Sequence, residues 1–383
     1  MKKLFYLGII GLALFEIFKV YFIMPMPGSQ RMNSIDIAYF LYSYRWYLRI
    51  SFCTMILIGA KSTFQTSKYK WVPFVILIIP AVIVYMFNFK MSADSMFKQP
   101  QKLSFLPKGE NILNDSSIVV AVNHNGETKA YPIRFIGYHH QIQDVVGGVP
   151  MIITYCTVCR TGRIFQPTVK GHPEKFRLVG MDHFNAMFED VSTGSWWRQV
   201  NGEAIAGKLK GEILPEVESF QMTLGKLFEL YPNAVVMQSD ESSKDNYDSL
   251  ARYERGKSIG DLTRRDSLSW KDKSWVVGVI SGKASKAFDW NNLKEVRIIN
   301  DKVGNTPIVL VMASDEQSFV AFERPSESEA FTIENDSLFA GTKGYNLSGR
   351  NADQSRSLKK LNAYQEFWHS WKTFHPDTEQ YTR

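Results

Sequence analysis

The stretch VVAVNHNGETKAYPIRFIGYHHQIQDVVGGVPMIITY, residues 119–155, decides how most of this chain is organised, because a related stretch returns farther along. VVGVISGKASKAFDWNNLKEVRIINDKVGNTPIVLVM occupies residues 276–312, at an offset of 157 residues without a gap. Ten positions are identical: Val119, Val120, Val122, Lys129, Ala130, Ile142, Asp144, Val146, Gly147 and Pro150 recur as Val276, Val277, Val279, Lys286, Ala287, Ile299, Asp301, Val303, Gly304 and Pro307. Such self-similarity indicates two copies of one structural unit.

Each copy is expected to consist mostly of strands. SIVVAV, VPMIITY, WVVGVI and TPIVLVM are short β-branched runs bounded by turn-forming residues. The run 151–155 is apolar almost throughout, which predicts burial on both faces. The aromatic segments LGKLFELYP (224–232) and LNAYQEFWHSWKTFHP (361–376) each end in proline and predict a helix at the end of each copy. We therefore predict a β-rich α+β protein: a three-helix membrane segment at 1–92, a first copy at 93–240 and a second copy at 241–383.

The N-terminal region has the composition of a membrane segment. Three apolar stretches, 4–24, 38–60 and 71–89, approach the roughly 20 residues that a spanning helix needs. The net charge of the chain is +7, and residues 1–90 hold ten Lys or Arg against two acidic residues, which leaves −1 for the rest. A basic excess beside apolar stretches is typical of membrane-flanking charge, so we expect a lipid bilayer as partner and no nucleic acid.

The distribution of Lys and Arg also predicts the orientation. Lys2 and Lys3 precede the first stretch, and three lysines lie between the second and the third. The positive-inside rule then places the N-terminus in the cytoplasm and, with three spans, the C-terminal region outside the inner cell membrane. If the second stretch, which contains Arg45 and Arg49, only lies on the membrane, the C-terminal region is cytoplasmic.

The main candidates for reactive residues lie in MIITYCTVCRTGRIF, residues 151–165, which holds two of the three cysteines. Cys156 and Cys159 have three interpretations: a thiol–disulfide couple, half of a metal site, or a structural disulfide. The second copy has Ala313 and Glu316 at the matching positions, so the unit is expected to fold without the cysteines. This favours a function confined to the first copy.

A metal site would need further ligands, and histidines of the first copy are candidates. His139 and His140 are replaced by Val296 and Arg297 in the second copy, so they disappear together with the cysteines. His183 is a third candidate. Two cysteines with histidines would suit zinc or copper.

A second polar cluster lies in STGSWWRQVNGEAIAG, residues 192–207. Trp197, Arg198 and Glu203, together with Arg160 beside the cysteines, are candidates for binding a cofactor or ligand. The alternative interpretation is a β-hairpin with Asn201-Gly202 as a type I′ turn and tryptophan in the core.

KAYPIRFIGYHHQIQDVVGGVPMIITYCTVCRTGRIF, MFEDVSTGSWWRQVNGEAIAG and FWHSWKTFHPDTEQY resemble, in order, the bacterial and archaeal family called domain of unknown function 3179. The resemblance covers about residues 105–383 and implies that Cys156, Cys159 and His139 occupy the family's cysteine and histidine positions. The sequence departs from the family pattern at Thr157-Val158, where Pro-Leu is common, and at His140, where Glu is common. The resemblance implies an exported or membrane-associated protein and no particular activity.

The sequence thus predicts a membrane-anchored extracytoplasmic protein. Its Cys/His site would bind a transition metal or cycle between thiol and disulfide, with Cys156 and Cys159 as the reacting residues. The alternative is a non-enzymatic, membrane-tethered module that binds a protein or small ligand and whose cysteines form a structural disulfide.

Overall fold

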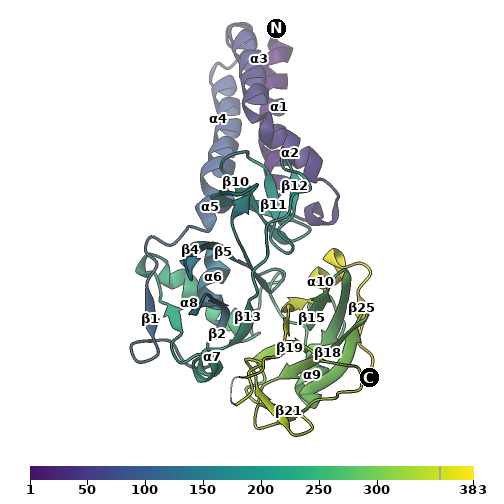
Figure 1. The fold of residues 1–383 in the computed structure, drawn as a ribbon. Coiled ribbons are helices and arrows are strands. Elements are labelled where there is room, and N and C mark those ends of the chain that lie inside the picture. Colours follow the sequence, from purple (N-terminus) through teal and green to yellow (C-terminus); the bar gives the residue numbers. More distant parts are fainter. Residues whose placement is uncertain (353–354) are drawn as a thin grey trace. The chain divides into compact units, whose positions relative to one another are not determined.

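The computed structural model describes residues 1–352 and 355–383, and the chain forms two compact units (Figure 1). Unit 1 comprises Met1–Lys98, Lys175–Arg198 and Glu203–Ile213. Unit 2 comprises Gln99–Glu174, Gln199–Gly202 and Leu214–Arg383. Helices predominate at the N-terminus and strands elsewhere, so the predicted strand-rich α+β class is confirmed.

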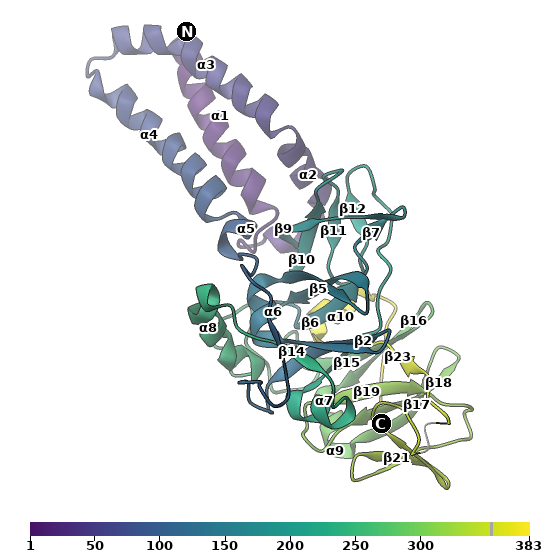
Figure 2. The same cartoon turned by 60° about the vertical axis from the view of Figure 1, so that its left-hand side comes forward.

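The helical part of unit 1 is built from the apolar N-terminal stretches. Its elements are α1 (Lys2–Tyr21), η1 (Ser29–Arg31), α2 (Ile35–Ser43), α3 (Arg45–Thr66), α4 (Trp71–Tyr85), its π-helical continuation η2 (Met86–Lys90) and α5 (Ala93–Met96). Helix α1 runs beside both α3 and α4 and lies between them (Figure 2). Gly8 and Gly59 permit the close approach of α1 and α3, because a Cβ at Gly59 would lie 2.4 Å from the backbone nitrogen of Phe5.

Two helices among the described residues are long and apolar enough to cross a membrane. They are α1 and the segment Trp71–Lys90, which joins α4 to η2. The expected second span, 38–60, is divided at Tyr44 between α2 and α3. Helix α3 carries Arg45, Arg49 and several hydroxyl residues, which lower its hydropathy below that of the other two.

Unit 1 also contains a four-stranded antiparallel sheet of order β12-β11-β10-β9. Its strands are β9 (Phe176–Asp182), β10 (Asn185–Asp190), β11 (Trp196–Arg198) and β12 (Ala204–Ala206). The Met181 N–H donates to the carbonyl of Ile23 at 2.7 Å, and Trp196 packs edge-on against Tyr39. The sheet is therefore attached to the ends of the helices through backbone bonding and a shared apolar core.

The first half of unit 2 carries the cysteine turn. Its elements are β1 (Phe105–Pro107), β2 (Ile118–His124), β3 (Glu127–Pro132), α6 (Ile133–His139), β4 (Gln141–Val146), β5 (Val149–Cys156), β6 (Thr161–Phe165), β7 (Thr168–Val169), β8 (His172–Pro173), β13 (Phe220–Thr223), α7 (Leu224–Leu230), β14 (Val235–Met237), η3 (Glu241–Ser243) and α8 (Lys244–Glu254). Helix α8 lies against α6 (Figure 2). Residues 151–155 are all buried, as predicted.

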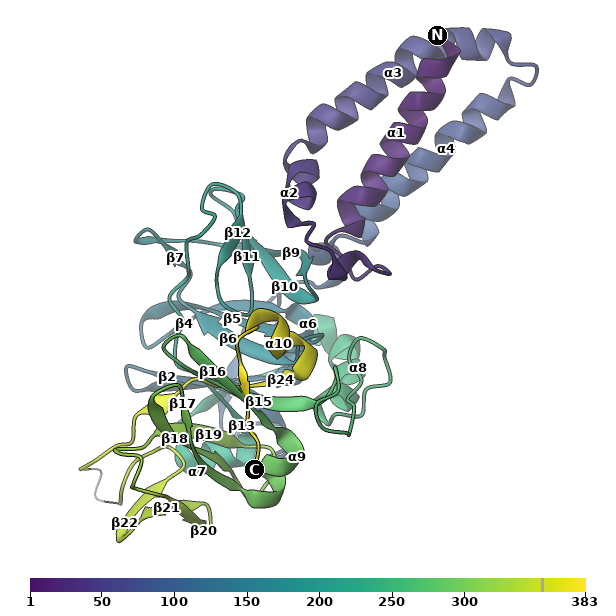
Figure 3. The same ribbon diagram turned by 90° about the vertical axis from the view of Figure 1, so that its right-hand side faces the viewer.

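The second half of unit 2 contains the remaining elements (Figure 3). They are β15 (Trp275–Ser281), β16 (Ala284–Asp289), α9 (Trp290–Val296), β17 (Ile298–Val303), β18 (Thr306–Met312), β19 (Phe319–Glu323), β20 (Thr332–Glu334), β21 (Ser337–Ala340), β22 (Lys343–Asn346), β23 (Lys360–Leu361), β24 (Ala363–Phe367), α10 (Trp368–Phe374) and β25 (Glu379–Gln380). The predicted C-terminal helix is wrong over its first part, because residues 363–367 pair with β15 as β24 and the helix begins only at Trp368.

The elements of the two halves follow the same order. Strands β2 and β15 begin 157 residues apart, and so do β3 and β16, α6 and α9, β4 and β17, and β5 and β18. The sheet order β14-β3-β2-β13 in the first half matches β25-β16-β15-β24 in the second. Backbone conformation also agrees at matched turns, with φ of 55° at Gly147 and 56° at Gly304.

Candidate functional site

The two cysteines lie on a tight turn between paired strands. Strand β5 ends at Cys156, residues 157–160 form the turn, and Thr161 opens β6 opposite Cys156. Arg160 closes the turn with a φ of 58°. Both cysteines are 0% exposed and are present as thiols. We refer to Cys156, Cys159 and the turn between them as the dithiol turn.

Strand register in the second half places two polar side chains beside the dithiol turn. Strands β15 and β24 are antiparallel, with Trp275 opposite Phe367. Beyond this pair, the Trp368 N–H donates to the carbonyl of Ser274 and the His369 N–H to the carbonyl of Asp272, both at 2.9 Å, so the first residues of α10 stay bonded to the segment that holds Lys273. The Phe367 N–H donates to the carbonyl of Cys159 at 2.8 Å, which fixes this end of the strand pair on the turn.

Lys273 contributes a cation to the site from outside the dithiol turn. Its Nζ donates to the carbonyl of Val158, between the two cysteines, at 3.1 Å, and to the carbonyl of Leu262 at 2.5 Å. It also lies 4.5 Å from the ring centre of Phe367, a cation–π distance. Burial lowers the pKa of Lys273 to about 8, although its attraction to Cys159 and Cys156 partly opposes the shift. At pH 7 the ammonium is therefore mostly charged, and a cation at this place favours the thiolate form of a nearby cysteine.

His369 completes the polar surroundings of the dithiol turn. Its Nε2 lies 3.1 Å from Lys273 Nζ and 3.2 Å from the carbonyl of Val158, so it accepts from the lysine in one tautomer and donates to the carbonyl in the other. Burial, followed by the charge of Lys273, lowers the pKa of His369 to about 4. The imidazole is consequently neutral at pH 7.

Arg160 stabilises the dithiol turn through the hydrogen bonds of its buried side chain. It is 0% exposed, and its guanidinium donates to the Gln365 side chain at 2.9 Å and to the carbonyls of Tyr253 and Glu254, both at 3.1 Å. The same group lies 3.8 Å from the ring centre of Trp275. The arginine that we predicted as a cofactor-binding residue thus has protein partners and connects the two halves of unit 2.

The histidines predicted as metal ligands have other partners. His139 Nε2 lies 2.5 Å from the hydroxyl of Tyr247, and His140 Nδ1 lies 2.8 Å from the carbonyl of Tyr155. His183 belongs to unit 1, whereas the cysteines belong to unit 2. Within the described residues, no group of three or more His, Cys, Asp or Glu is placed to hold a metal ion. Two thiols alone do not supply the four ligands of a zinc or copper site of the expected kind.

The other predicted residues meet in unit 1. Asp182 accepts from Arg198 at 2.6 Å and lies 2.7 Å from His183, while Arg198 also reaches Glu203 at 3.2 Å. Burial opposes the ionisation of Asp182, but hydrogen bonds from His183 and Arg198 outweigh it and lower its pKa. The hydrogen bond to Asp182 raises the pKa of His183. These residues form an ion-pair cluster on the sheet of unit 1.

Trp197, the remaining predicted ligand-binding residue, is a core residue. It is 1% exposed, and its indole N–H donates to Asp190 at 2.9 Å. The hairpin interpretation holds for β11 and β12, but the type I′ turn is wrong. Gly202 has a positive φ and Asn201 does not, whereas a type I′ turn requires both.

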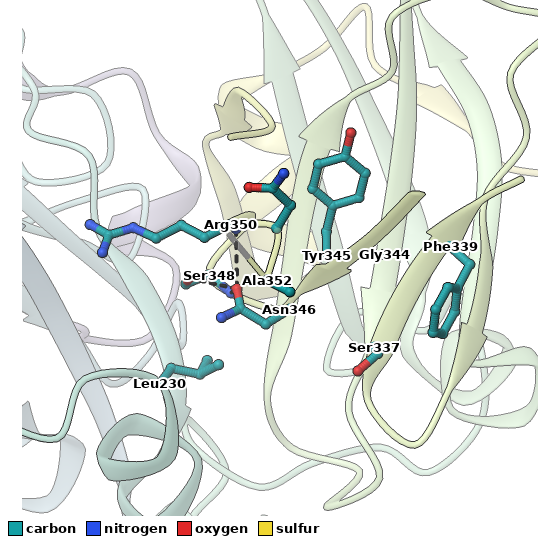
Figure 4. A pocket seen from close by; sticks show the side chains of 10 residues that line it. Leu230, Ser337, Phe339, Gly344, Tyr345, Asn346, Ser348, Arg350 and Ala352 are labelled. Carbon is teal, nitrogen blue, oxygen red and sulfur yellow. Dashed lines mark hydrogen bonds between the residues drawn. The ribbon is translucent and has the colours of Figure 1, made fainter. Parts of the chain in front are cut away.

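Unit 2 also has an open hollow that shares no residue with the dithiol turn (Figure 4). It has a volume of about 460 Å³ and is lined by Leu230, Ser337, Phe339, Gly344, Tyr345, Asn346, Ser348, Arg350, Asn351 and Ala352. The Asn346 Oδ1 accepts from the backbone of Ser348 and Arg350 at 3.0 and 3.1 Å, so this amide stabilises its own loop. The lining of the hollow contains serines but no Cys, His, Lys, Asp or Glu, and its one charged side chain, Arg350, is exposed, so we take the dithiol turn as the candidate site.

Lys273 and His369 are the functional candidates that the sequence did not identify. The sequence placed His369 in an aromatic helix and gave Lys273 no role. The signal that could have found them is the antiparallel register of the strands at 275–281 and 363–367, but the second of these was predicted as helix.

The fold and site together define a strand-rich α+β protein with a helical N-terminal region and a buried dithiol turn. The chain belongs to the family described as "Protein of unknown function (DUF3179)", whose sequence pattern it matches over residues 95–378. No curated protein and no solved structure matches the chain.

Proposed function

We propose that this protein is a membrane-anchored thiol–disulfide protein in which Cys156 and Cys159 alternate between dithiol and disulfide. The observation that carries the proposal is the Lys273 ammonium, held 3.1 Å from the carbonyl of Val158 between the two cysteines. A cation beside a Cys-x-x-Cys pair is the arrangement that favours a reactive thiolate.

The exposure pattern of the helices supports an anchor of three spans. Apolar side chains point outward on each long helix: Leu7, Ile10 and Leu14 on α1, Trp46, Ile50 and Leu57 on α3, and Phe74, Ile78 and Val82 on α4. Glu16, by contrast, is 0% exposed and accepts from Lys19 at 2.8 Å and from Arg49 at 2.6 Å. An apolar exterior around paired interior charges is typical of helices in lipid. Glu16, Lys19 and Arg49 thus have charged partners within the bundle.

Reporter fusions would test the three spans and the orientation. A reporter joined after Lys68, between α3 and α4, should report a cytoplasmic position, and one joined after Arg383 an extracytoplasmic position. If only α1 and α4 cross, both positions invert. The inverted result would place the dithiol turn in the reducing cytoplasm and argue against a stable extracytoplasmic disulfide.

Duplication gives the two copies different tasks in this proposal. We infer that residues 93–240 and 241–383 are two copies of one unit, which the shared order of β2 to β5 and β15 to β18 supports, and that the sheet β9–β12, which lies in unit 1, is an addition to the first copy. The first copy supplies the thiols, and the second supplies Lys273 and His369. The position of Cys159 is occupied by Glu316 in the second copy, so only one dithiol site exists per chain.

Redox titration of the full-length protein tests the proposed chemistry. After equilibration with mixtures of reduced and oxidised glutathione, alkylation followed by mass spectrometry should show Cys156 and Cys159 changing together from two free thiols to one disulfide. A potential between about −120 and −270 mV, the range of thiol–disulfide catalysts, is expected. Cys53→Ser is the control and should leave the titration unchanged, because Cys53 lies in α3.

The second candidate is a structural disulfide, favoured by the complete burial of both cysteines. Structural disulfides have potentials below about −300 mV and resist the glutathione pool. A pair that stays oxidised throughout the titration, with a large loss of stability on Cys159→Ser, would support that candidate and contradict the redox function.

A further inference from the structure

Unit 1 contains a small pocket where its helices meet its sheet. The pocket has a volume of about 90 Å³. Its wall is formed by the ends of α1, α2 and η2, the beginning of α5 and part of strand β9, all of which belong to unit 1. Most of the lining side chains are apolar, but Lys19 and Arg177 also line it. The pocket thus combines an apolar wall with two cationic groups.

Exposed aromatic residues indicate the depth of this pocket in the proposed membrane anchor. Tyr44, Trp46 and Tyr47 are 49%, 62% and 73% exposed where α2 meets α3, and Tyr85 is 52% exposed at the end of α4. Both places lie near the end of the helical bundle that adjoins the sheet, as the pocket does (Figure 2). Tyrosine and tryptophan are enriched where a membrane protein passes through the lipid headgroups. The pocket therefore lies at the depth of the headgroups.

Positive charge exceeds negative charge around the pocket. Among the described residues, the charged side chains that line it, or that form a hydrogen bond with a lining residue, are four cations and three carboxylates: Lys19, Arg45, Arg49 and Arg177 against Glu16, Asp94 and Glu189. Lys19 and Arg49 share the carboxylate of Glu16. The Asp94 side chain is 49% exposed, so water already solvates much of its charge. An unbalanced charge near the hydrocarbon is costly, so this place favours an anion.

Lys19 is positioned to bind that anion. Its Nζ donates to Glu16 at 2.8 Å and to the side-chain oxygen of Asn88 at 2.5 Å, which uses two of its three N–H donors. The side chain is only 8% exposed, and it lines the pocket. The Arg177 guanidinium, which is bonded to Glu189 at 2.7 Å, supplies a second cation to the same pocket.

We propose that this pocket binds the headgroup phosphate of an anionic glycerophospholipid from the surrounding membrane. The inference goes beyond the redox function and rests on the proposed membrane anchor. A phosphate accepts strong, charge-assisted hydrogen bonds from ammonium and guanidinium groups, and its charge balances the excess cation. The pocket is too small for acyl chains, which stay in the bilayer. A zwitterionic lipid carries its own cation and does not balance the charge.

Native mass spectrometry of the full-length protein, released from a mild detergent, tests this binding. The detergent solution contains phosphatidylglycerol and phosphatidylcholine with the same acyl chains and at equal concentrations. One phosphatidylglycerol should bind per chain, at least about tenfold more tightly than phosphatidylcholine, because each nearby basic residue strengthens the binding of an anionic lipid. Glycerol 3-phosphate, measured separately, should bind far more weakly, since the detergent micelle does not concentrate it beside the pocket.

Three variants assign the bound lipid to the pocket. Lys19→Met should reduce the binding of phosphatidylglycerol to the level of phosphatidylcholine. Ala93→Leu should also reduce it, because Ala93 lines the pocket and a larger side chain fills part of the space without changing any charge. Lys2→Met, at the opposite end of α1, is the control and should leave the binding unchanged. If Lys19→Met does not fold, Ala93→Leu and the comparison of the two lipids decide the question.

Four results would overturn the lipid proposal. Equal binding of the two lipids, or an equal loss in Lys2→Met and Lys19→Met, would mean that the pocket does not select the lipid. Unchanged binding in Ala93→Leu would place the lipid elsewhere. Glycerol 3-phosphate that binds as tightly as phosphatidylglycerol would make a soluble phosphate compound the ligand. A protein that stays dispersed without detergent would contradict the anchor as well, which separates that failure from the others.

Discussion

Replacing Lys273 with methionine should slow the reaction of the reduced Cys156–Cys159 pair with glutathione disulfide by about 10- to 100-fold at pH 7. A neighbouring charge that favours an ionised group shifts its pKa by about 1–3 units, so removing the ammonium lowers the thiolate population by up to about 10- to 1,000-fold. The rate falls by less, because a thiolate of higher pKa is the stronger nucleophile. Methionine retains much of the apolar stem of lysine, so the packing changes little. Stopped-flow fluorescence of the full-length protein measures the rate.

The pH dependence separates the charge of Lys273 from its packing. Lys273 has a pKa of about 8, so its ammonium is present below that pH and is lost above it. The ratio of wild-type to Lys273→Met rates should therefore be largest below pH 8 and should fall as the pH rises through 8. Lys273→Arg, which stays charged, should keep the rate at low pH, and Lys372→Met on α10 is the exposed control. A constant ratio across this range would contradict the electrostatic role.

Replacing Glu366 with alanine should destabilise unit 2 by about 3–5 kcal/mol, because it leaves a buried guanidinium without its main partner. Arg163 and Glu366 are 1% and 0% exposed and lie 2.8 Å apart. Glu216 is 3.5 Å from Arg163 but is 27% exposed, so it compensates only in part. Urea unfolding of the full-length protein, followed by tryptophan fluorescence, should show the loss as a lower midpoint.

A double variant shows why Glu366→Ala loses stability: either because it leaves a buried charge unpaired, or because the fold requires the ion pair itself. Arg163→Met with Glu366→Leu removes both charges, and such apolar replacements are often neutral or stabilising. The double variant should recover most of the stability lost by Glu366→Ala. Equal losses in both variants would mean that the pair contributes more than charge compensation. Lys359→Ala, which removes an exposed partner of Glu323, should change the stability by less than about 1 kcal/mol.

Much of unit 2 could be predicted from local patterns. The runs at 118–124 and 275–281 are short, β-branched and bounded by turns, and they form β2 and β15. The apolar run before Cys156 forms the central strand of the sheet β4-β5-β6, and its side chains Met151, Ile153 and Tyr155 belong to the hydrophobic core. Local patterns failed at 363–367, where aromatic residues suggested a helix but pairing with β15 imposed a strand. The paired strands β15 and β24 are far apart in the sequence, so their pairing cannot be recognised from neighbouring residues, and it overrides the local propensity of residues 363–367.

The candidate site, too, was predictable from the sequence only in part. The sequence by itself identified Cys156 and Cys159, since two cysteines three apart at the end of an apolar run are a local feature that the duplicate lacks. Only the tertiary structure brought Lys273 and His369 to the dithiol turn, more than 100 residues away along the chain, and gave Arg160, His139 and His140 other partners. The physical reason is that spacing along the chain determines which side chains one strand or turn presents, whereas the register between distant strands determines which charges meet.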